Sequence, residues 1–444
     1  MTGKQSTGIH IITGFALLFI CATVKQPECL GYLKNKMILP TRADTNIKNR
    51  EGSFLEDLMK KYPQYFEQVL KNRREWNVQI LYTRVDRDLK GNPELQTFPF
   101  NVDPTRYFYP ASTVKLPVVL LALQRINELK DKGIDKYTAM ITERGTAVQS
   151  AVYNDPTTSD GRPTIAHYVK KILMVSDNDA FNRLYEFLGQ GYINEELHKK
   201  GYKDAQILHR LSISLNEDEN RQTNPLRFLG HDNRLLYDQP GQWNKQQYAP
   251  RNDFLGLGYM RGDKLVNSPM DFSRKNRISL SDLHEILLSI VFPEKVPANK
   301  RFNLTEDDRR FVLRYMSQLP TESIYPPYKA DTVNYWPAYG KFLLYGAQKG
   351  TIPGSIRIFS KEGDAYGQML DVAYVADFNN KIEFFLSATL YCNSDGILND
   401  DKYDYETIGL PFLKHLGQVI YDMELKRDRK IRPDLSPFFF EYDK

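Results

Sequence analysis

One stretch of nine residues, Tyr109-Pro-Ala-Ser-Thr-Val-Lys-Leu-Pro117, constrains this chain more than any other. A turn-forming pair, Asp103-Pro104, precedes it, and apolar residues follow it at helical spacing as far as Gly133. The pattern predicts a buried helix with Ser112 at its N-terminal mouth and Lys115 one turn further along the same face. A hydroxyl at that position faces free N–H groups and the positive end of the helix, which stabilise an anion.

Lys115 is the residue that could turn Ser112 into a nucleophile. Its apolar neighbours would desolvate the ammonium group, lower its pKa and let the amine accept the Ser112 proton. Ser-x-x-Lys alone is a weak signal, because a chain of this length contains about one or two such patterns by chance. The alternative is a serine helix cap beside a solvated lysine.

A second polar group lies between two apolar helices. Thr164 is placed to cap the first helix, Gly189 to close the second, and Ser176-Asp177-Asn178 joins them. The tripeptide would project polar side chains where the two helices meet. Because Ser, Asp and Asn all cap helices, an ordinary link is the alternative.

The two ends of the chain are predicted to share one sheet. Strands are expected over residues 78–85, 355–359, 369–375 and 382–391, and helices over 53–69 and 411–423. A mainly helical block over residues 112–320 separates the N-terminal from the C-terminal strands. Antiparallel strands layered against helices predict an α+β fold.

The composition excludes several classes of function. Lys and Arg number 60 against 55 Asp and Glu, and this net charge of +5 contains no polybasic run, so no nucleic-acid partner is expected. Cys21, Cys29 and Cys392 are too few for a disulfide framework. The seven histidines are scattered, so neither a metal site nor a cofactor is expected. The length allows one large domain with insertions or two ordinary domains.

The N-terminus has the pattern of a leader. Lys4 precedes a largely apolar run over residues 11–24, which has the length of a signal-peptide core. Export to the periplasm or cell envelope is favoured over a buried helix. Residues 18–21, which end at Cys21, loosely resemble a lipoprotein cleavage box. Association with a membrane is expected only if Cys21 is lipidated. The expected layout is a leader over 1–31, a linker over 32–52, a domain over 53–425 and a tail over 426–444.

Taken in order, Ser112-x-x-Lys115, Ser176-Asp-Asn and Lys361-x-Gly363 resemble the motifs of class A β-lactamases and penicillin-binding serine hydrolases. The resemblance covers about residues 53–425 and implies their fold, an antiparallel sheet from the two chain ends with a helical block between. It implies that Ser112 is acylated, that Lys115 is its general base and that Ser176 relays a proton to the leaving nitrogen.

The resemblance also implies how a ligand is held. Asn178 would hold the ligand and Lys115, while Lys361 would anchor a ligand carboxylate. The backbone N–H groups of Ser112 and Asp364 would form the oxyanion hole, and Gly363 would let a ligand lie along the strand. The implied partner is a small-molecule β-lactam or a cell-wall peptide-like substrate, and a monomer is expected.

The loop that supplies the deacylating water departs from the family pattern Arg-x-Glu-x-x-Leu-Asn. Arg210 and Asn216 are kept, but Ser212 stands where the Glu belongs. A neutral hydroxyl is a poor base for water. Glu217 and Glu219 could replace either this acid or the family's Asp that pairs with the Arg, and the spacing assigns neither.

Two further departures concern the cleft. Glu362 replaces the usual Thr or Ser between Lys361 and Gly363, and its charge would oppose a ligand carboxylate unless it points away from the cleft. An insertion over about residues 217–276, poor in aliphatic residues, follows the altered loop. It is either an ordered lid or cleft wall, or a flexible excursion.

Two classes of function remain. The first is an enzyme that acylates Ser112 with a β-lactam, a D-Ala-D-Ala-like peptide or another amide or ester, as a β-lactamase or carboxypeptidase does. The second is a binding protein on the same scaffold that releases its ligand slowly or forms no acyl bond. The intact set of motif residues favours acylation, and the missing Glu argues against fast turnover.

Overall fold

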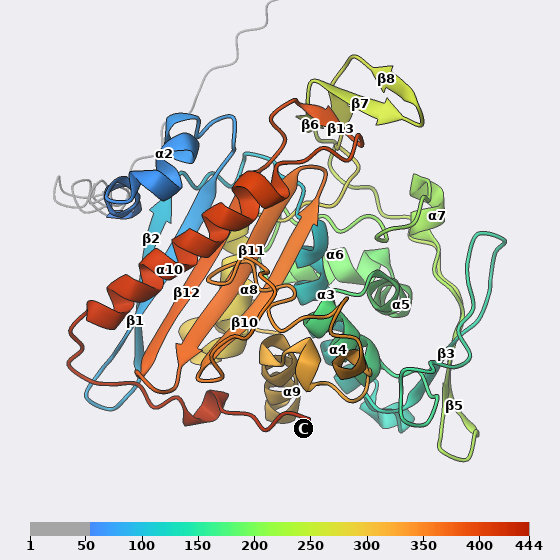
Figure 1. Cartoon of the computed structure of the whole chain (residues 1–444). Helices are drawn as coiled ribbons and strands as arrows, with labels where there is room; N and C mark the ends of the chain where they lie inside the picture. Colours follow the sequence, from blue (N-terminus) through green and yellow to red (C-terminus); the bar gives the residue numbers. More distant parts are fainter. Residues whose placement is uncertain (1–53, 444) are drawn as a thin grey trace, which may run out of the picture. The chain divides into compact units, whose positions relative to one another are not determined.

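A five-stranded antiparallel sheet forms the centre of the fold (Figure 1). The computed structural model describes residues 54–443, and its sheet has the strand order β10-β11-β12-β1-β2. These strands are β1 Gln79–Arg87, β2 Pro93–Phe100, β10 Ile356–Ala365, β11 Gln368–Asp377 and β12 Ile382–Tyr391. Because two strands precede the helical block and three follow it, the predicted α+β fold with a sheet from both chain ends is confirmed.

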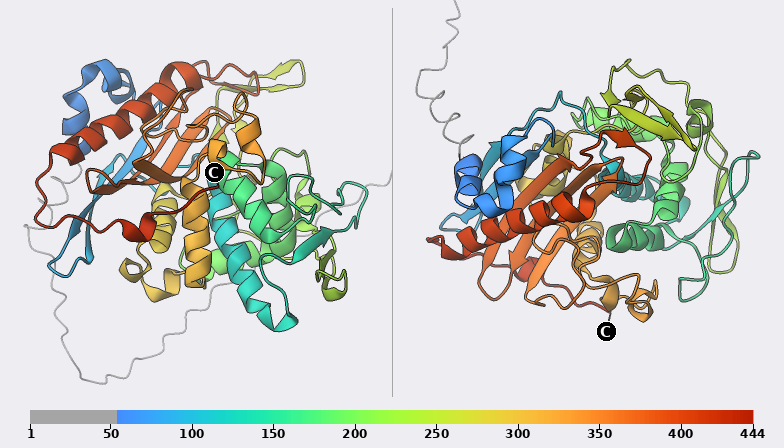
Figure 2. Two further views of the ribbon diagram at one scale, coloured as in Figure 1. Left: turned by 60° about the horizontal axis from the view of Figure 1, so that its bottom comes forward. Right: turned by 45° about the horizontal axis from the view of Figure 1, so that its top comes forward.

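Helices cover both faces of this sheet. α10 (Leu410–Lys426) crosses one face, and α8 (Leu280–Val291) packs against the other (Figures 1 and 2). Successive side chains of β1 alternate between the two sides: Tyr82 belongs to the core beneath α10, and Leu81 to the core beneath α8. With both faces buried, the whole of β11 is buried as well.

The block between the two halves of the sheet is mainly helical, as predicted. Its further helices are α3 Lys115–Glu128, α4 Ile165–Val175, α5 Asn178–Leu188, α6 Gln190–Lys199, α7 Glu217–Arg221 and α9 Glu306–Ser317. Thr164 caps α4 through its hydroxyl, which accepts a hydrogen bond from the His167 N–H, and Ser279 caps α8 in the same way. α5 ends at Gly189, as the sequence predicts.

Several elements differ from the sequence prediction. The helix expected over residues 53–69 is interrupted: residues 54–60 are helical, and α2 (Pro63–Lys71) starts afresh at a proline, which is favoured at the first position of a helix. The sequence pattern predicts neither α6 nor β2, whose two prolines suit its place at the edge of the sheet. β10 continues through Gly363, because pairing with β11 overrides weak local propensity.

The insertion carries secondary structure of its own. Besides α7 it contains β4 Leu226–Leu229, β5 Leu235–Gln239, β6 Phe254–Leu255, β7 Gly258–Arg261, β8 Lys264–Val266 and β9 Met270–Asp271. β4 and β5 extend a small sheet from β3 (Ala139–Thr142), while β7 and β8 form another with β13 (Ile397–Leu398). The insertion is therefore paired with strands that lie before and after it in the chain.

The predicted leader, with Cys21, and the predicted linker lie outside the described residues. Within residues 54–443, no helix combines the length and the hydropathy needed to cross a membrane. Cys392 is buried and carries a free thiol. The C-terminal tail returns to the protein, where Leu435 and Phe438 pack into the core beneath α8.

Candidate active site

Ser112 lies in a turn of 3₁₀ helix, Ala111–Val114, that leads directly into α3. The turn is closed by the Thr113 N–H, which donates to the Pro110 carbonyl at 3.1 Å. α3 is buried along most of its length, so the turn is held at the surface of the core while the Ser112 side chain stays half-buried. The predicted position of Ser112 at the mouth of a buried helix is thus found, one short turn earlier than the α-helix itself.

Lys115 joins four polar groups of the site. Its Nζ lies 2.9 Å from Ser112 Oγ, 3.1 Å from Ser176 Oγ and 2.7 Å from Asn178 Oδ1, and it also contacts the Ser176 carbonyl oxygen. The side chain is fully buried. Desolvation, followed by the positive charge of Lys361, holds the pKa of Lys115 well below its usual value of 10.5.

These contacts prescribe how a neutral Lys115 amine is oriented. The Ser176 carbonyl and Asn178 Oδ1 can only accept hydrogen bonds, so they take the two N–H groups of the neutral amine. The remaining lone pair is then left for a hydroxyl. Ser112 Oγ is one of the two hydroxyls within reach, so the geometry suits Lys115 as its base.

Ser176 connects the two lysines of the site. It ends α4 in the left-handed conformation, at φ +59°, and Asp177 then caps α5 by accepting a hydrogen bond from the Ala180 N–H. Ser176 Oγ accepts a hydrogen bond of 2.8 Å from Lys361 Nζ and lies 3.1 Å from Lys115 Nζ. When Lys115 is neutral, its two N–H groups are taken by the Ser176 carbonyl and Asn178 Oδ1, so towards Ser176 Oγ it can only accept a hydrogen bond. The Ser176 hydroxyl is thus placed to exchange a proton with Lys115.

β10 brings Lys361 and Gly363 against the turn that carries Ser112. A Cβ placed on Gly363 would lie 2.7 Å from the Ser112 backbone N, closer than packed atoms approach. Glycine is therefore required for this close contact between strand and turn. Asp364 follows Gly363 on β10. The backbone N–H groups of Asp364 and Ser112 therefore belong to the strand and the turn that are in contact here.

The backbone is strained around the site. Ala111, Ser176 and Ser212 all have positive φ angles, of 45°, 59° and 54°, although none is a glycine. Such conformations cost about 1–3 kcal/mol each and persist where the surrounding fold imposes them. Ser176 is itself a motif residue, Ala111 directly precedes Ser112, and Ser212 is hydrogen-bonded to Asn178.

A cleft of about 720 Å³ opens at this point, and its lining includes Ser112, Asn178, Ser212 and Asp364. The insertion forms part of the cleft wall, to which it contributes Tyr248, Asp271, Arg274 and Lys275. Although the Asp364 carboxylate is reachable by solvent, its surroundings in the cleft desolvate it, and Glu362 lies nearby. Desolvation, followed by the Glu362 charge, raises the pKa of Asp364.

Ser212 lies next to the motif residues, on the loop predicted to supply water. Its hydroxyl accepts a hydrogen bond of 2.8 Å from Asn178 Nδ2. Asn216 instead caps α7 in a capping box with Glu219, whose Oε2 accepts from the Asn216 N–H at 2.7 Å. Glu217 forms an ion pair with Arg221 at 2.9 Å. Both candidate acids are thus engaged elsewhere in the loop.

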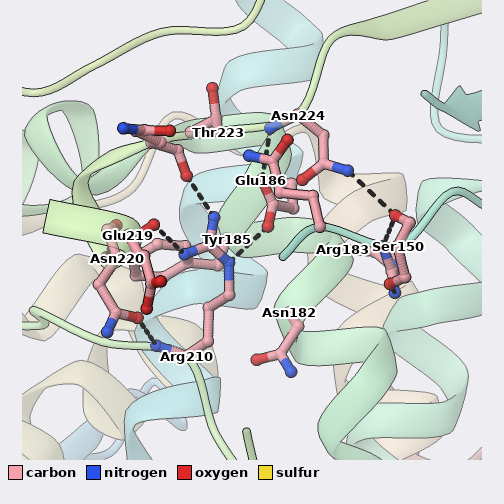
Figure 3. Close-up of polar contacts among 12 residues, drawn as sticks. Ser150, Asn182, Arg183, Tyr185, Glu186, Arg210, Glu219, Asn220, Thr223 and Asn224 are labelled. Atoms are coloured by element: carbon pink, nitrogen blue, oxygen red, sulfur yellow. Dashed lines mark hydrogen bonds and ion pairs between the residues drawn. The ribbon is translucent and has the colours of Figure 1, made fainter. Parts of the chain in front are cut away.

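The partner of Arg210 is Glu186, a residue of α5 that the sequence reasoning missed. Figure 3 shows the Arg210 guanidinium between the Glu186 carboxylate and the backbone of the loop. Glu186 Oε2 also accepts from the Asn224 N–H at 2.6 Å, and Arg210 donates to the Glu219 carbonyl at 3.2 Å. An acid placed among the buried residues of α5 is the signal that could have revealed it, since a buried charge needs a partner.

In the described part of the chain, no group of three or more His, Cys, Asp or Glu side chains could hold a metal ion.

The structure brings together the residues that the sequence motifs name, which are Ser112, Lys115, Ser176, Asn178, Lys361 and Gly363. Among the loop residues, Ser212 joins this group, whereas Arg210 binds Glu186 of α5 and Asn216 caps α7.

Comparison with known proteins gives a family. A family model described as the β-lactamase enzyme family matches residues 64–408, a range that contains every site residue above. No curated protein matches the chain.

Similar solved structures include a class A β-lactamase from Clostridium kluyveri, at 15% identity and a TM-score of 0.45, which covers 81% of this chain and 98% of that one. A β-lactamase from Burkholderia phymatum has 13% identity and a TM-score of 0.43, over 85% and 98% of the two chains. One from Sphaerobacter thermophilus has 14% identity and a TM-score of 0.41, over 79% and 94%.

Proposed function

The chain belongs to the β-lactamase enzyme family, and from this premise we propose that it is a serine hydrolase that forms an acyl-enzyme at Ser112. The acyl donor would be a β-lactam or a related amide or ester, and hydrolysis of the acyl-enzyme would be slow. The observation that carries the proposal is the buried amine of Lys115, 2.9 Å from the Ser112 hydroxyl, with a pKa lowered by desolvation and by Lys361.

In the proposed acylation, the neutral Lys115 amine takes the Ser112 proton while Oγ attacks the carbonyl carbon of the ligand. The oxygen of the tetrahedral intermediate becomes an anion and accepts hydrogen bonds from the backbone N–H groups of Ser112 and Asp364. The bond between carbon and leaving group then breaks. Ser176 gives its proton to the leaving nitrogen and recovers one from Lys115, which returns to the neutral amine.

Deacylation needs a second base to activate water, and Ser212 takes the place of that base. Its hydroxyl, hydrogen-bonded to Asn178, can position a water without removing its proton at neutral pH. General-base catalysis contributes about 10²–10⁴-fold to a rate, so its loss would leave the acyl-enzyme to accumulate. A protein that keeps its acyl group indefinitely would instead be a penicillin-binding protein without turnover.

The proposal is tested by labelling with a fluorophosphonate probe and mapping the labelled peptide. We expect the label on Ser112, and none on the Ser112→Ala variant. Ser214→Ala is the matched control, because Ser214 lines the same cleft but has no lysine partner, and it should label normally. A label that persists on Ser112→Ala at another residue would show that the nucleophile is wrongly assigned.

A further inference from the structure

Lys361 has no hydrogen-bond donor left for a ligand. An ammonium group has three donors, and the Nζ of Lys361 lies 2.8 Å from Ser176 Oγ, 3.0 Å from the Glu362 carbonyl oxygen and 3.0 Å from Glu362 Oε1. Its side chain has no exposed surface, and it is not part of the cleft lining. An incoming carboxylate would therefore have to displace an internal partner.

The Glu362 carboxylate is fixed beside Lys361. It is buried, and a Cβ on Gly340 would lie 3.1 Å from its carboxyl carbon, so the backbone of Gly340 packs against it. Burial alone would raise the pKa of Glu362, but the charge and hydrogen bond of Lys361 and the charge of buried Lys341 lower it. The Glu362 carboxylate is thus ionised at neutral pH. It is held between Lys361, which it pairs with, and the backbone of Gly340.

We propose that Glu362 determines substrate specificity by supplying internally the carboxylate that Lys361 would otherwise bind, so that the site prefers acyl donors without a carboxylate beside the scissile bond. The preferred donors are uncharged amides or esters. This inference rests on the proposed acylation of Ser112 and concerns which donors reach it.

The rest of the cleft agrees with this preference. Asp364, next to Gly363 on the same strand, adds a second carboxylate at this end of the cleft. The cationic side chains that line the cleft are Arg210, Arg221, Arg274 and Lys275, of which the last three belong to the insertion. Each of the three arginines forms an ion pair with an acid. A ligand carboxylate bound next to β10 would therefore face the negative charge of Asp364. The Lys361 ammonium group of that strand is already paired with Glu362.

The first test uses the wild-type protein and a matched pair of ligands, a chromogenic cephalosporin and its methyl ester. The measured quantity is the second-order rate constant for acylation of Ser112. The ester should react faster than the acid, and acylation by the acid at an equal or higher rate would overturn the inference. If the acid reacted faster in the wild-type protein but not in Lys275→Ala, the group that binds the ligand carboxylate would be Lys275 of the insertion. If neither compound acylates Ser112, the proposed function itself fails.

The second test removes the internal carboxylate. Glu362→Gln keeps the shape of the side chain and frees the Lys361 charge, so the ratio of acid to ester reactivity should rise about 10- to 100-fold, the range of a charge-assisted hydrogen bond. Glu322→Gln is the control, because Glu322 pairs with Arg357 of the same strand and does not line the cleft. An unchanged ratio in a folded Glu362→Gln variant would contradict the inference.

Discussion

Replacing Glu186 should destabilise the protein far more than replacing a partly exposed acid. Glu186 and Arg210 are both buried, and the carboxylate accepts hydrogen bonds from the Arg210 guanidinium and, at 2.6 Å, from the Asn224 N–H. In Glu186→Gln the guanidinium keeps its charge but faces only neutral groups. Breaking a buried ion pair by removing one partner costs about 3–5 kcal/mol.

The assay is equilibrium unfolding in urea, compared with Glu143→Gln. Glu143 pairs with Arg227, whose side chain is 49% exposed, so its loss should cost about 0–1 kcal/mol. Hydrogen exchange should also accelerate over residues 209–224 in Glu186→Gln, because this loop is tied to α5 through the pair. The double variant Glu186→Gln with Arg210→Met also removes the unpaired guanidinium, so it should recover part of the lost free energy of unfolding. A loss for Glu186→Gln no larger than that of the control would refute the reasoning.

Three other predictions concern the chemistry. Ser212→Glu restores an acid beside Asn178, so it should speed the slow phase after the burst with a chromogenic cephalosporin by up to about 10²–10⁴-fold; rapid wild-type turnover without a burst would contradict slow deacylation. Because the pKa of Lys115 is lowered, acylation should rise with pH and level off well below pH 10.5, and Lys361→Ala, which removes a like charge, should move that rise to higher pH. Gly363→Ala should reduce acylation about 100-fold or more, because its Cβ would lie 2.7 Å from the Ser112 N–H nitrogen; an unchanged rate would mean that this N–H does not stabilise the oxyanion.

Local signals were sufficient to predict four of the five strands of the central sheet, all except β2, and the helices that cover its two faces. The alternating and apolar runs of β1, β11 and β12 and the caps of α4 and α8 are encoded by residues near one another in the chain. The order of the three motifs along the chain was also enough to predict that they meet around Ser112. The reason is that strands from before and after the helical block pair in one sheet.

The features that the sequence did not predict depend on contacts between distant residues. Glu186 reaches Arg210 only because α5 packs beneath the loop, and no local spacing pairs two residues 24 positions apart. The direction of the Glu362 side chain depends on Gly340, which belongs to a separate segment. β2 and α6 have weak patterns of their own, so tertiary packing decides their conformation.

The most direct measurement of the central claim is intact-mass spectrometry over time, with a penicillin and its methyl ester added to separate samples. Wild-type protein should gain the mass of one acyl group from at least one of the two compounds and hold it through a slow decay. Ser112→Ala should gain none. No adduct on the wild-type protein with either compound, or the same adduct on Ser112→Ala, would contradict acylation of Ser112.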